Sequence, residues 1–282
     1  MQIKHHIQAV VVLYKCSISQ SQTLNSLSDL KKEIDSLFDL DILIYNNSSL
    51  YPIPPHPNYQ IYNSPTNNML AGAYNYALQQ AIKKQINWLL LLDQDTTLSL
   101  HYFQELHKAI SLSLCSNNIA SIAPCVTSNK KQISPIQFNP TIGPKWFLKA
   151  VHPGTTSKCQ FAINSATLIN TSAITNIGNF PNEYPLDDLD ICYFYRLYKK
   201  GYSFITIPTT IQHQLSVLDY SKNMTHGRYQ SILFYDKQMA KEIGTIAQIA
   251  LSLRVFLRII IQIFSKSKRK YIKQTFYSLI KK

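Results

Sequence analysis

The stretch NWLLLLDQDTTLS, from Asn87 to Ser99, places two carboxylates directly after five apolar residues. An unbroken apolar run predicts a strand buried on both faces. Asp93 and Asp95 are two residues apart, so in extended backbone they point to the same side. Two such carboxylates repel each other unless a cation lies between them or one is protonated, and oxygen ligands suit Mg²⁺ or Mn²⁺. The alternative is a solvated loop in which Asp93 or Asp95 caps the next helix.

The residues around this stretch predict an α/β fold. Helices are expected at 20–38, 67–84 and 99–114, the last with Ser99 as its N-cap. They alternate with short apolar runs that predict strands at 7–14, 41–45, 59–63, 119–124 and ahead of Asp93. This alternation indicates a parallel sheet with crossover helices. Ligands of such sheets bind beyond the carboxyl ends of the strands, where both aspartates are expected.

A second acidic cluster, EYPLDDLDICYFYRLYKKGY, spans residues 183–202. It predicts a helix over 188–200 that ends at Gly201. Acidic residues at the start of a helix and lysines at its end are favoured by the helix dipole. Three aspartates, at 187, 188 and 190, exceed what capping requires. A further strand is expected at 203–208, with His213 just beyond it, although a lone histidine is more often a surface or core residue.

The composition excludes several classes of protein. The 282 residues are 45% hydrophobic, which indicates a globular protein. Seven glycines, with neither a P-loop nor a GxGxxG motif, argue against a glycine-rich phosphate loop. Five cysteines without CxxC spacing favour a reducing cytoplasm over disulfides or structural zinc. The apolar run near the N-terminus lacks a small-residue cleavage site and is expected to be a strand rather than a signal peptide.

Most of the net charge of +13 lies near the C-terminus. From Lys222 onward there are 13 Lys and Arg against 2 Asp and Glu. A nearly neutral body argues against nucleic acid, whereas a basic tail suggests an anionic surface. No run of about 18 apolar residues is present, so no spanning helix is expected. Arg254 and Arg258 interrupt the apolar tail on one helical face, which favours a helix in the membrane interface. A helix packed on the body is the alternative.

Several motifs, in this order, resemble those of one family. LLLLDQDTT is similar to a strand end that reads LDQDS or LDQDT, and NNMLAGAYN keeps four positions of NxGxAxAxN. LDDLDICYFYRLYKKGY is similar to IDxVDxEWCxRxxxxGY, and a histidine and an RxYY motif follow. The matching residues are Asn67, Ala71, Ala73, Asn75, Asp93, Asp95, Asp187, Asp190, Arg196, Gly201, Tyr202, His213, Arg228 and Tyr229. Over about 7–235 the chain resembles inverting nucleotide-sugar glycosyltransferases of family 2, closest to the bacterial rhamnosyltransferase-like branch.

The resemblance implies a GT-A domain at 1–235, with a donor-binding half at about 1–125 and an acceptor half at about 126–235. A basic amphipathic helical tail at 236–282 follows. It implies that Asp95, with His213, holds Mn²⁺ or Mg²⁺, and that Asp190 is the general base, with Asp188 and Asp187 as local alternatives. The nucleotide sugar would be bound by Asp93, Gln94, Asn46, Asn67 and Asn75. Arg196 and Arg228 would contact the acceptor or a phosphate.

The sequence departs from the family pattern at four positions: Asn46 replaces an aspartate, Met69 a glycine, Cys192 an acid and Tyr193 a tryptophan. The expected activity is transfer of a rhamnose-like or other hexose, galactose included, from a nucleoside diphosphate to a glycan or lipid-linked acceptor. Bacterial surface polysaccharide, such as O-antigen or capsule, is the expected product, made in the cytoplasm at the inner face of the membrane. A degenerate, non-catalytic homologue that binds a nucleotide or a membrane is the alternative.

Overall fold

The computed structural model describes residues 4–114, 118–212, 224–265 and 267–280. The chain forms two compact units. The first, here called the sheet unit, comprises residues 1–136 and 150–213. The second, the helical unit, comprises 137–149 and 214–282.

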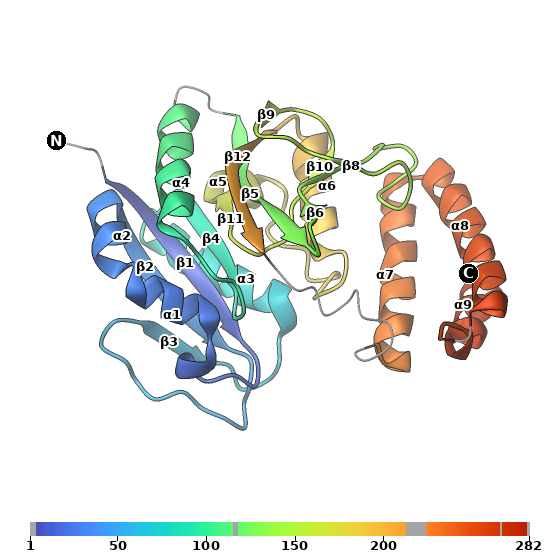
Figure 1. Ribbon diagram of the computed structural model, residues 1–282, viewed down its shortest axis with the longest axis horizontal. Helices are drawn as coiled ribbons and strands as arrows, with labels where there is room; N and C mark the ends of the chain where they lie inside the picture. The colour runs from blue at the N-terminus through green and yellow to red at the C-terminus, as the bar shows by residue number, and fades with distance from the viewer. Residues whose placement is uncertain (1–3, 115–117, 213–223, 266, 281–282) are drawn as a thin grey trace. The chain divides into compact units, whose positions relative to one another are not determined.

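The sheet unit is built on a nine-stranded sheet in the order β3-β2-β1-β4-β11-β5-β12-β9, with β6 paired to β5 (Figure 1). A three-stranded sheet has the order β10-β7-β8. The strands are β1 (His5–Leu13), β2 (Phe38–Asn46), β3 (Gln60–Asn63), β4 (Trp88–Asp93), β5 (Ile119–Ser128), β6 (Lys131–Ser134), β7 (Ile136–Gln137), β8 (Lys149–Ala150), β9 (Gly154–Thr156), β10 (Gln160–Phe161), β11 (Thr167–Asn170) and β12 (Ser203–Gln212). The helices are η1 (Ile18–Gln20), α1 (Gln22–Asp29), α2 (Lys31–Leu37), α3 (Met69–Lys83), α4 (Leu100–Ser113), α5 (Thr171–Asn176) and α6 (Leu189–Lys199).

The first four strands run parallel and end at the same edge. Asn46 of β2 lies opposite both Leu13 of β1 and Asn63 of β3, and Asp93 of β4 lies opposite Val12 of β1. The sheet is therefore mainly parallel, as the sequence predicted. One interior strand differs, because β11 runs antiparallel to both β4 and β5. Its reversed direction brings the residues just before β11 to the edge where β4 ends.

Side-chain alternation along β4 decides which face Asp93 points to. Leu90 and Leu92 belong to the core that includes Tyr102 and Phe103 of α4. Successive residues of a strand point to opposite faces, so Asp93 points away from α4. The opposite face is the one on which the buried residues of α3 lie, including Tyr74.

The single helix expected over residues 20–38 is divided into η1, α1 and α2. The hydroxyl of Ser21 accepts a hydrogen bond from the backbone N–H of Leu24 and begins α1, and Leu30, with φ −97° and ψ 9°, separates α1 from α2. Two other helix ends agree with the sequence. Ser99 Oγ accepts from the N–H of Tyr102 at 3.3 Å, and Gly201 follows α6 with φ +82°.

The helical unit consists of α7 (His226–Ile243), α8 (Thr245–Phe264), η3 (Arg269–Tyr271) and α9 (Ile272–Ile280), together with residues 137–149. The rings of Tyr229 and Tyr271 stack with centroids 4.5 Å apart inside it. Trp146 Nε1 donates to the carbonyl of Ala250 at 3.0 Å, which ties the 137–149 segment to α8. By length and composition alone, α8 is long and apolar enough to cross a membrane, with a mean hydropathy of 1.8 over an 18-residue window. The expectation that no helix spans a membrane therefore stays a prediction.

Candidate active site

Asp93 is fixed at the end of β4 by two hydroxyl groups. Ser165, which lies just before β11, donates from Oγ to Asp93 Oδ2 at 2.5 Å. Thr23 Oγ1 donates to the backbone carbonyl of Asp93 at 2.5 Å. The antiparallel course of β11 is what delivers Ser165 to this carboxylate. Asp93 is therefore held by contacts from two distant parts of the sequence.

Two fully buried tyrosines, Tyr74 of α3 and Tyr193 of α6, lie close to this carboxylate. Burial raises the pKa of Tyr74 well above its usual value, with further contributions from Asp93, Tyr193 and Asp190. Burial also raises the pKa of Tyr193, followed by the charges of Asp190 and Asp93. Both tyrosines therefore stay protonated near neutral pH. The charges of Asp93 and Asp190 raise the pKa of Tyr74 and of Tyr193 alike. The two carboxylates therefore lie near the same pair of tyrosines.

Contacts with neighbouring segments position the start of α6. Tyr193 donates its hydroxyl hydrogen to Asn164 Oδ1 at 2.7 Å. The first N–H groups of α3, on Leu70 and Ala71, donate to the carbonyl of Pro185 at 3.0 Å. Asn75 donates to the carbonyl of Phe180 and accepts from its N–H, at 2.9 and 3.0 Å. Asn75, predicted to bind the nucleotide sugar, thus holds the loop that leads into the acidic cluster.

The structure distinguishes the three aspartates of that cluster. Asp190 lies in the first turn of α6, where its Oδ1 accepts from the N–H of Ile191 at 2.9 Å. Asp188 is the N-cap residue and has a left-handed backbone, with φ +56°. Asp187 is buried. Of the three, Asp190 is the one whose charge raises the pKa of both tyrosines.

The hydroxyl of Tyr74 is buried and has no hydrogen-bond partner among the residues that the structure describes. A buried hydroxyl in that position costs free energy unless a ligand or water completes it. Sequence reasoning missed Tyr74, Asn164 and Ser165. An aromatic residue at helical spacing is indistinguishable from core, and the other two act through pairings between distant segments.

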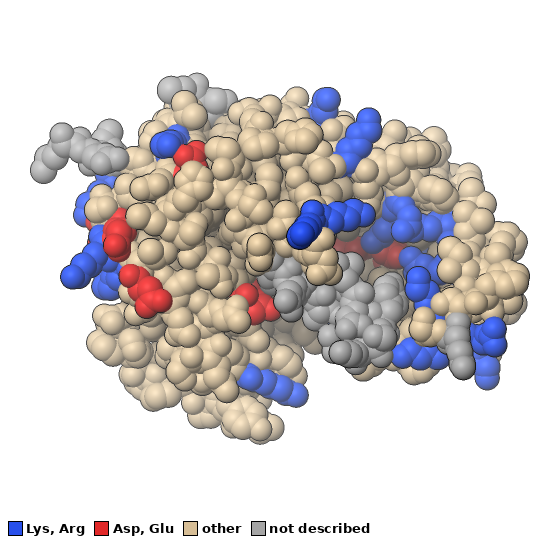
Figure 2. Space-filling model, in the orientation of Figure 1, with Lys and Arg blue, Asp and Glu red and all other residues tan. Residues whose placement is uncertain are grey.

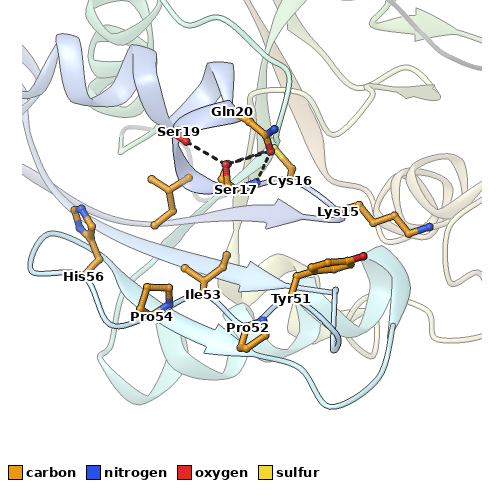
Figure 3. Close-up of a pocket in the computed structure, with 11 residues that line it drawn as sticks. Lys15, Cys16, Ser17, Ser19, Gln20, Tyr51, Pro52, Ile53, Pro54 and His56 are labelled. Carbon is orange, nitrogen blue, oxygen red and sulfur yellow. Dashed lines mark hydrogen bonds between the residues drawn. The ribbon is translucent and has the colours of Figure 1, made fainter.

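A pocket of about 700 Å³ opens beyond the ends of β1 and β2 (Figure 3). Its lining comes from residues 15–20 and from the loop after β2. In Figure 3, Lys15 and Tyr51 lie at one end and His56 at the other. Burial raises the pKa of the Cys16 thiol, with a smaller contribution from Asp95. Asp95, which is exposed, therefore lies near this pocket.

The remaining predicted site residues have varied surroundings. Asn46 is buried and donates from Nδ2 to the carbonyl of Tyr51 and to Asn63 Oδ1, both at 2.8 Å. Gln94 Oε1 accepts from the N–H of Tyr14 at 2.9 Å. Asn67 Oδ1 accepts from the N–H of Met69 at 3.0 Å, at the start of α3. Asn46, Gln94 and Asn67 therefore all support loops at the carboxyl edge.

Two arginines and one histidine complete the predicted set. Arg196 Nη2 is 2.7 Å from Glu183 Oε1, within the acidic cluster. Arg228 lies in the first turn of α7, in the helical unit, where its N–H donates to Thr225 Oγ1. His213 lies outside the described residues. Within the described ranges, no group of three or more His, Cys, Asp or Glu side chains is arranged to hold a metal ion.

No protein-family model and no curated protein matches this chain. Solved structures do match. A structure of GalNAc-T7 with UDP, GalNAc and Mn²⁺ aligns with TM-score 0.55 and 11% identity over 88% of this chain and 53% of that one, so this chain spans about half its length. The mannosyltransferase PcManGT of Pyrobaculum calidifontis, with GDP-Man and Mn²⁺, aligns with TM-score 0.54 and 12% identity over 99% of this chain and 75% of that one. The chain therefore has the GT-A fold of these glycosyltransferases, with a C-terminal helical tail.

Proposed function

We propose that this chain is a metal-dependent, inverting glycosyltransferase that moves a hexose from a nucleoside diphosphate to a hydroxyl group. One observation carries the proposal. Ser165 donates to Asp93, and its neighbour Asn164 accepts from Tyr193 of α6, the helix whose first turn holds Asp190. These contacts bring the strand end and the helix start together. Carboxylates gathered at the carboxyl edge of a sheet, in a GT-A fold, suit recognition of a sugar and removal of a proton.

The pocket beyond β1 and β2 is the proposed site of the nucleoside. It combines the ammonium group of Lys15 with the ring of Tyr51, which is 65% exposed. An aromatic face suits a base, and a cation suits a phosphate. Asp95 lies near the pocket, and Asp93 lies two residues earlier, at the end of β4. The nucleoside of the donor would therefore lie in the pocket and its sugar near the end of β4. Asn67, Gln94 and Asn75 are proposed to shape this donor site.

Asn46 supports the pocket in a way that an aspartate could not. Both of its hydrogen bonds to Tyr51 and Asn63 are donated by the amide nitrogen, which a carboxylate lacks. The departure from the family pattern is thus accommodated by the loop that lines the pocket. This favours a working donor site over the degenerate, non-catalytic alternative.

The residues present fit a divalent cation. Mg²⁺ and Mn²⁺ are commonly held by one or two carboxylates together with substrate phosphates. Asp95 offers an exposed carboxylate close enough to affect Cys16 of the pocket, and His213 is the proposed second ligand. When bound, such an ion would neutralise charge on the departing diphosphate.

The reaction proposed for Asp190 is proton removal. Its carboxylate takes the proton of the acceptor hydroxyl as that oxygen bonds to the anomeric carbon of the donor. The bond from the anomeric carbon to the diphosphate oxygen breaks, the nucleoside diphosphate leaves, and one displacement inverts the configuration. Tyr74 and Tyr193 stay protonated near neutral pH, so they add no negative charge beside the two carboxylates.

The finer assignments come from the sequence resemblance. They are a rhamnose-like or other hexose, a glycan or lipid-linked acceptor, and a role in bacterial surface polysaccharide synthesis. Contacts of Arg196 and Arg228 with the acceptor or a phosphate are part of the same proposal.

The test is calorimetric binding of UDP-, GDP- and dTDP-hexoses with Mn²⁺, followed by transfer assays. One donor should bind, and Asp95→Asn should weaken its Mn²⁺-dependent binding by about tenfold or more, or roughly 1.4 kcal/mol. Asp39→Asn is the matched control, since Asp39 is an exposed carboxylate near the start of β2. The donor should also slow alkylation of Cys16, followed by mass spectrometry. Binding without any transfer or donor hydrolysis would favour the non-catalytic alternative, and no donor binding would refute both the enzyme and a nucleotide-binding homologue.

A further inference from the structure

We propose that α8 lies in the headgroup region of an anionic lipid bilayer, with one apolar face buried among the lipids. The face, here called the α8 stripe, consists of Ile246, Ile249, Leu253, Phe256, Leu257, Ile260 and Phe264. This inference does not depend on the proposed enzymatic activity.

The α8 stripe is continuous and exposed. Its members follow one another at helical spacings of mainly three and four residues, so they share one face. Each is between 39% and 82% exposed. The other side of α8 is buried in the helical unit through Ala247, Leu251, Val255 and Gln262. A helix that is apolar on its protein side and on its outer side needs a second apolar partner.

The two arginines of α8 lie off this stripe. Arg254 has its guanidinium 5.9 Å from the ring centroid of Trp146, and Arg258 Nη2 is 4.0 Å from Asp236 Oδ2. Both contacts are with residues inside the helical unit. The sequence suggested that these arginines mark the polar side of an interfacial helix, but the structure turns them toward protein. The stripe therefore contains no charged side chain.

Basic side chains follow the stripe directly. Lys268, Arg269, Lys270 and Lys273 are all exposed, and Phe276 and Tyr277 of α9 add exposed aromatic rings beside them. Figure 2 shows Lys and Arg side chains gathered on the part of the chain that forms the C-terminal helices. Apolar burial and attraction to anionic headgroups would act together on such a surface.

Among possible occupants of the stripe, an anionic bilayer surface fits the charge best. A spanning α8 would have to leave its buried contacts and carry Arg254 and Arg258 into the hydrocarbon, which is unfavourable. A second copy would bring two sets of the same basic residues together, and like charges across an interface oppose association. Anionic lipid instead complements them.

The first test is flotation of the full-length protein with phosphatidylglycerol-containing vesicles, with phosphatidylcholine vesicles for comparison. Leu253→Asp/Leu257→Asp should lower the bound fraction by about tenfold or more. Leu112→Asp/Leu114→Asp is the matched control, because those two leucines are also exposed, at 70% and 64%, but lie at the end of α4 in the sheet unit. The control should bind like the original protein. Thermal melts should show that both variants fold.

A second variant tests the charge. Lys270→Gln/Lys273→Gln should weaken binding to anionic vesicles, whereas Lys199→Gln/Lys200→Gln, at the exposed end of α6, should not. Raising salt from about 0.1 M to about 1 M, which shortens the Debye length from about 10 Å to about 3 Å, should release the original protein only partly.

Three results would overturn the proposal. The first is a full-length protein that stays unbound at low salt. The second is a stripe variant that converts a dimer to a monomer, which would assign the stripe to a second copy. The third is a stripe variant that binds vesicles normally but melts well below its control, which would assign the stripe to a protein contact.

Discussion

At the scale of single residues, the environment of Asp190 leads to a sharp expectation. Its charge raises the pKa of both Tyr74 and Tyr193, which places the carboxylate beside the end of β4. Asp190→Asn keeps the size of the side chain but cannot accept a proton. Transfer should fall by roughly 10²-fold or more, while donor binding measured by calorimetry stays within a few-fold.

Asp188→Asn and Asp187→Asn are the controls for this variant. Asparagine tolerates the left-handed backbone of Asp188, so that variant should fold normally. Each control should lose less activity than Asp190→Asn. If Asp188→Asn is the inactive variant instead, the base is Asp188.

The two buried tyrosines allow stability and activity to be separated. Tyr193→Phe leaves Asn164 Oδ1 without its donor in a buried position, so the free energy of unfolding should fall by about 1–3 kcal/mol. Tyr74→Phe removes a hydroxyl that lacks a partner among the described residues, so it should leave stability unchanged or raise it. Urea unfolding measures both. Because the Tyr74 hydroxyl is buried, Tyr74→Phe should also keep transfer within a few-fold of the original protein. A large loss of transfer in a variant of unchanged stability would show that this hydroxyl takes part in the reaction.

At this scale the sequence could predict the carboxylates but not their neighbours. Asp93, Asp95 and Asp190 stand out because charged residues beside buried segments are unusual. Tyr74 could not be predicted as a site residue. A tyrosine on the buried face of a helix has the same sequence spacing whether it only packs in the core or lies beside the site. Ser165 acquires its role only through the antiparallel pairing of β11 with β4, which no local pattern encodes.

At the scale of elements, the start of α3 explains a departure from the family pattern. Met69 stands where the resembling family has glycine, and its φ is +55°, in the region that favours glycine. The left-handed backbone costs a residue with a side chain about 1–2 kcal/mol. Glycine relieves that cost but loses about 0.5–1 kcal/mol of conformational entropy.

Met69→Gly and Met69→Ala both remove a side chain that is 39% exposed, so they lose similar packing. Only glycine relieves the strain, so Met69→Gly should be more stable than Met69→Ala by up to about 1.5 kcal/mol. Met69→Ala is the control, because alanine keeps the strain. Thermal or urea unfolding compares the two. An alanine variant at least as stable as the glycine variant would contradict the strain argument.

Most elements could be predicted from hydrophobic periodicity, and the exceptions have identifiable causes. The apolar spacing of residues 20–38 is helical throughout, yet Ser21 begins a new helix and Leu30 ends it. The division depends on the backbone geometry at the helix caps, which hydrophobic periodicity does not predict. The sequence indicates a strand at β11, but its antiparallel direction escaped prediction because strand direction is set by long-range pairing.

At the scale of the whole molecule, the two units are interleaved in the sequence. Residues 137–149 belong with the C-terminal helices although more of the sheet unit follows them. Residues 125–159 contain several Pro, Ser and Thr residues and no clear hydrophobic periodicity, so the sequence does not indicate this division. Ending the chain near Gln248 would remove Ala250, the partner of Trp146, and Leu251 and Val255 of the buried face of α8. Point substitutions therefore test the tail better than truncation.

The ion pair between Lys145 and Asp236 connects the inserted segment to α7. Lys145 Nζ is 2.6 Å from Asp236 Oδ1, and the Asp236 side chain is only 1% exposed. Lys145→Met removes the closer of two cations that face Asp236, because Arg258 Nη2 remains 4.0 Å from Asp236 Oδ2. The free energy of unfolding should therefore fall by about 1–3 kcal/mol, less than the roughly 3–5 kcal/mol expected for a fully unpaired buried charge. Lys145→Met/Asp236→Leu should recover part of that loss, because no carboxylate then remains buried, although Arg258 loses this contact.

Lys31→Met is the matched control, since Lys31 and Asp35 form an exposed pair at 2.8 Å. It should cost no more than about 1 kcal/mol. Urea unfolding, followed by tryptophan fluorescence of Trp146 and Trp88, compares the variants in both units. Because Lys145 and Asp236 lie outside the sheet unit, donor binding under native conditions should stay unchanged in the double variant. A Lys145→Met protein as stable as the Lys31→Met control would mean that this pair does not hold the inserted segment.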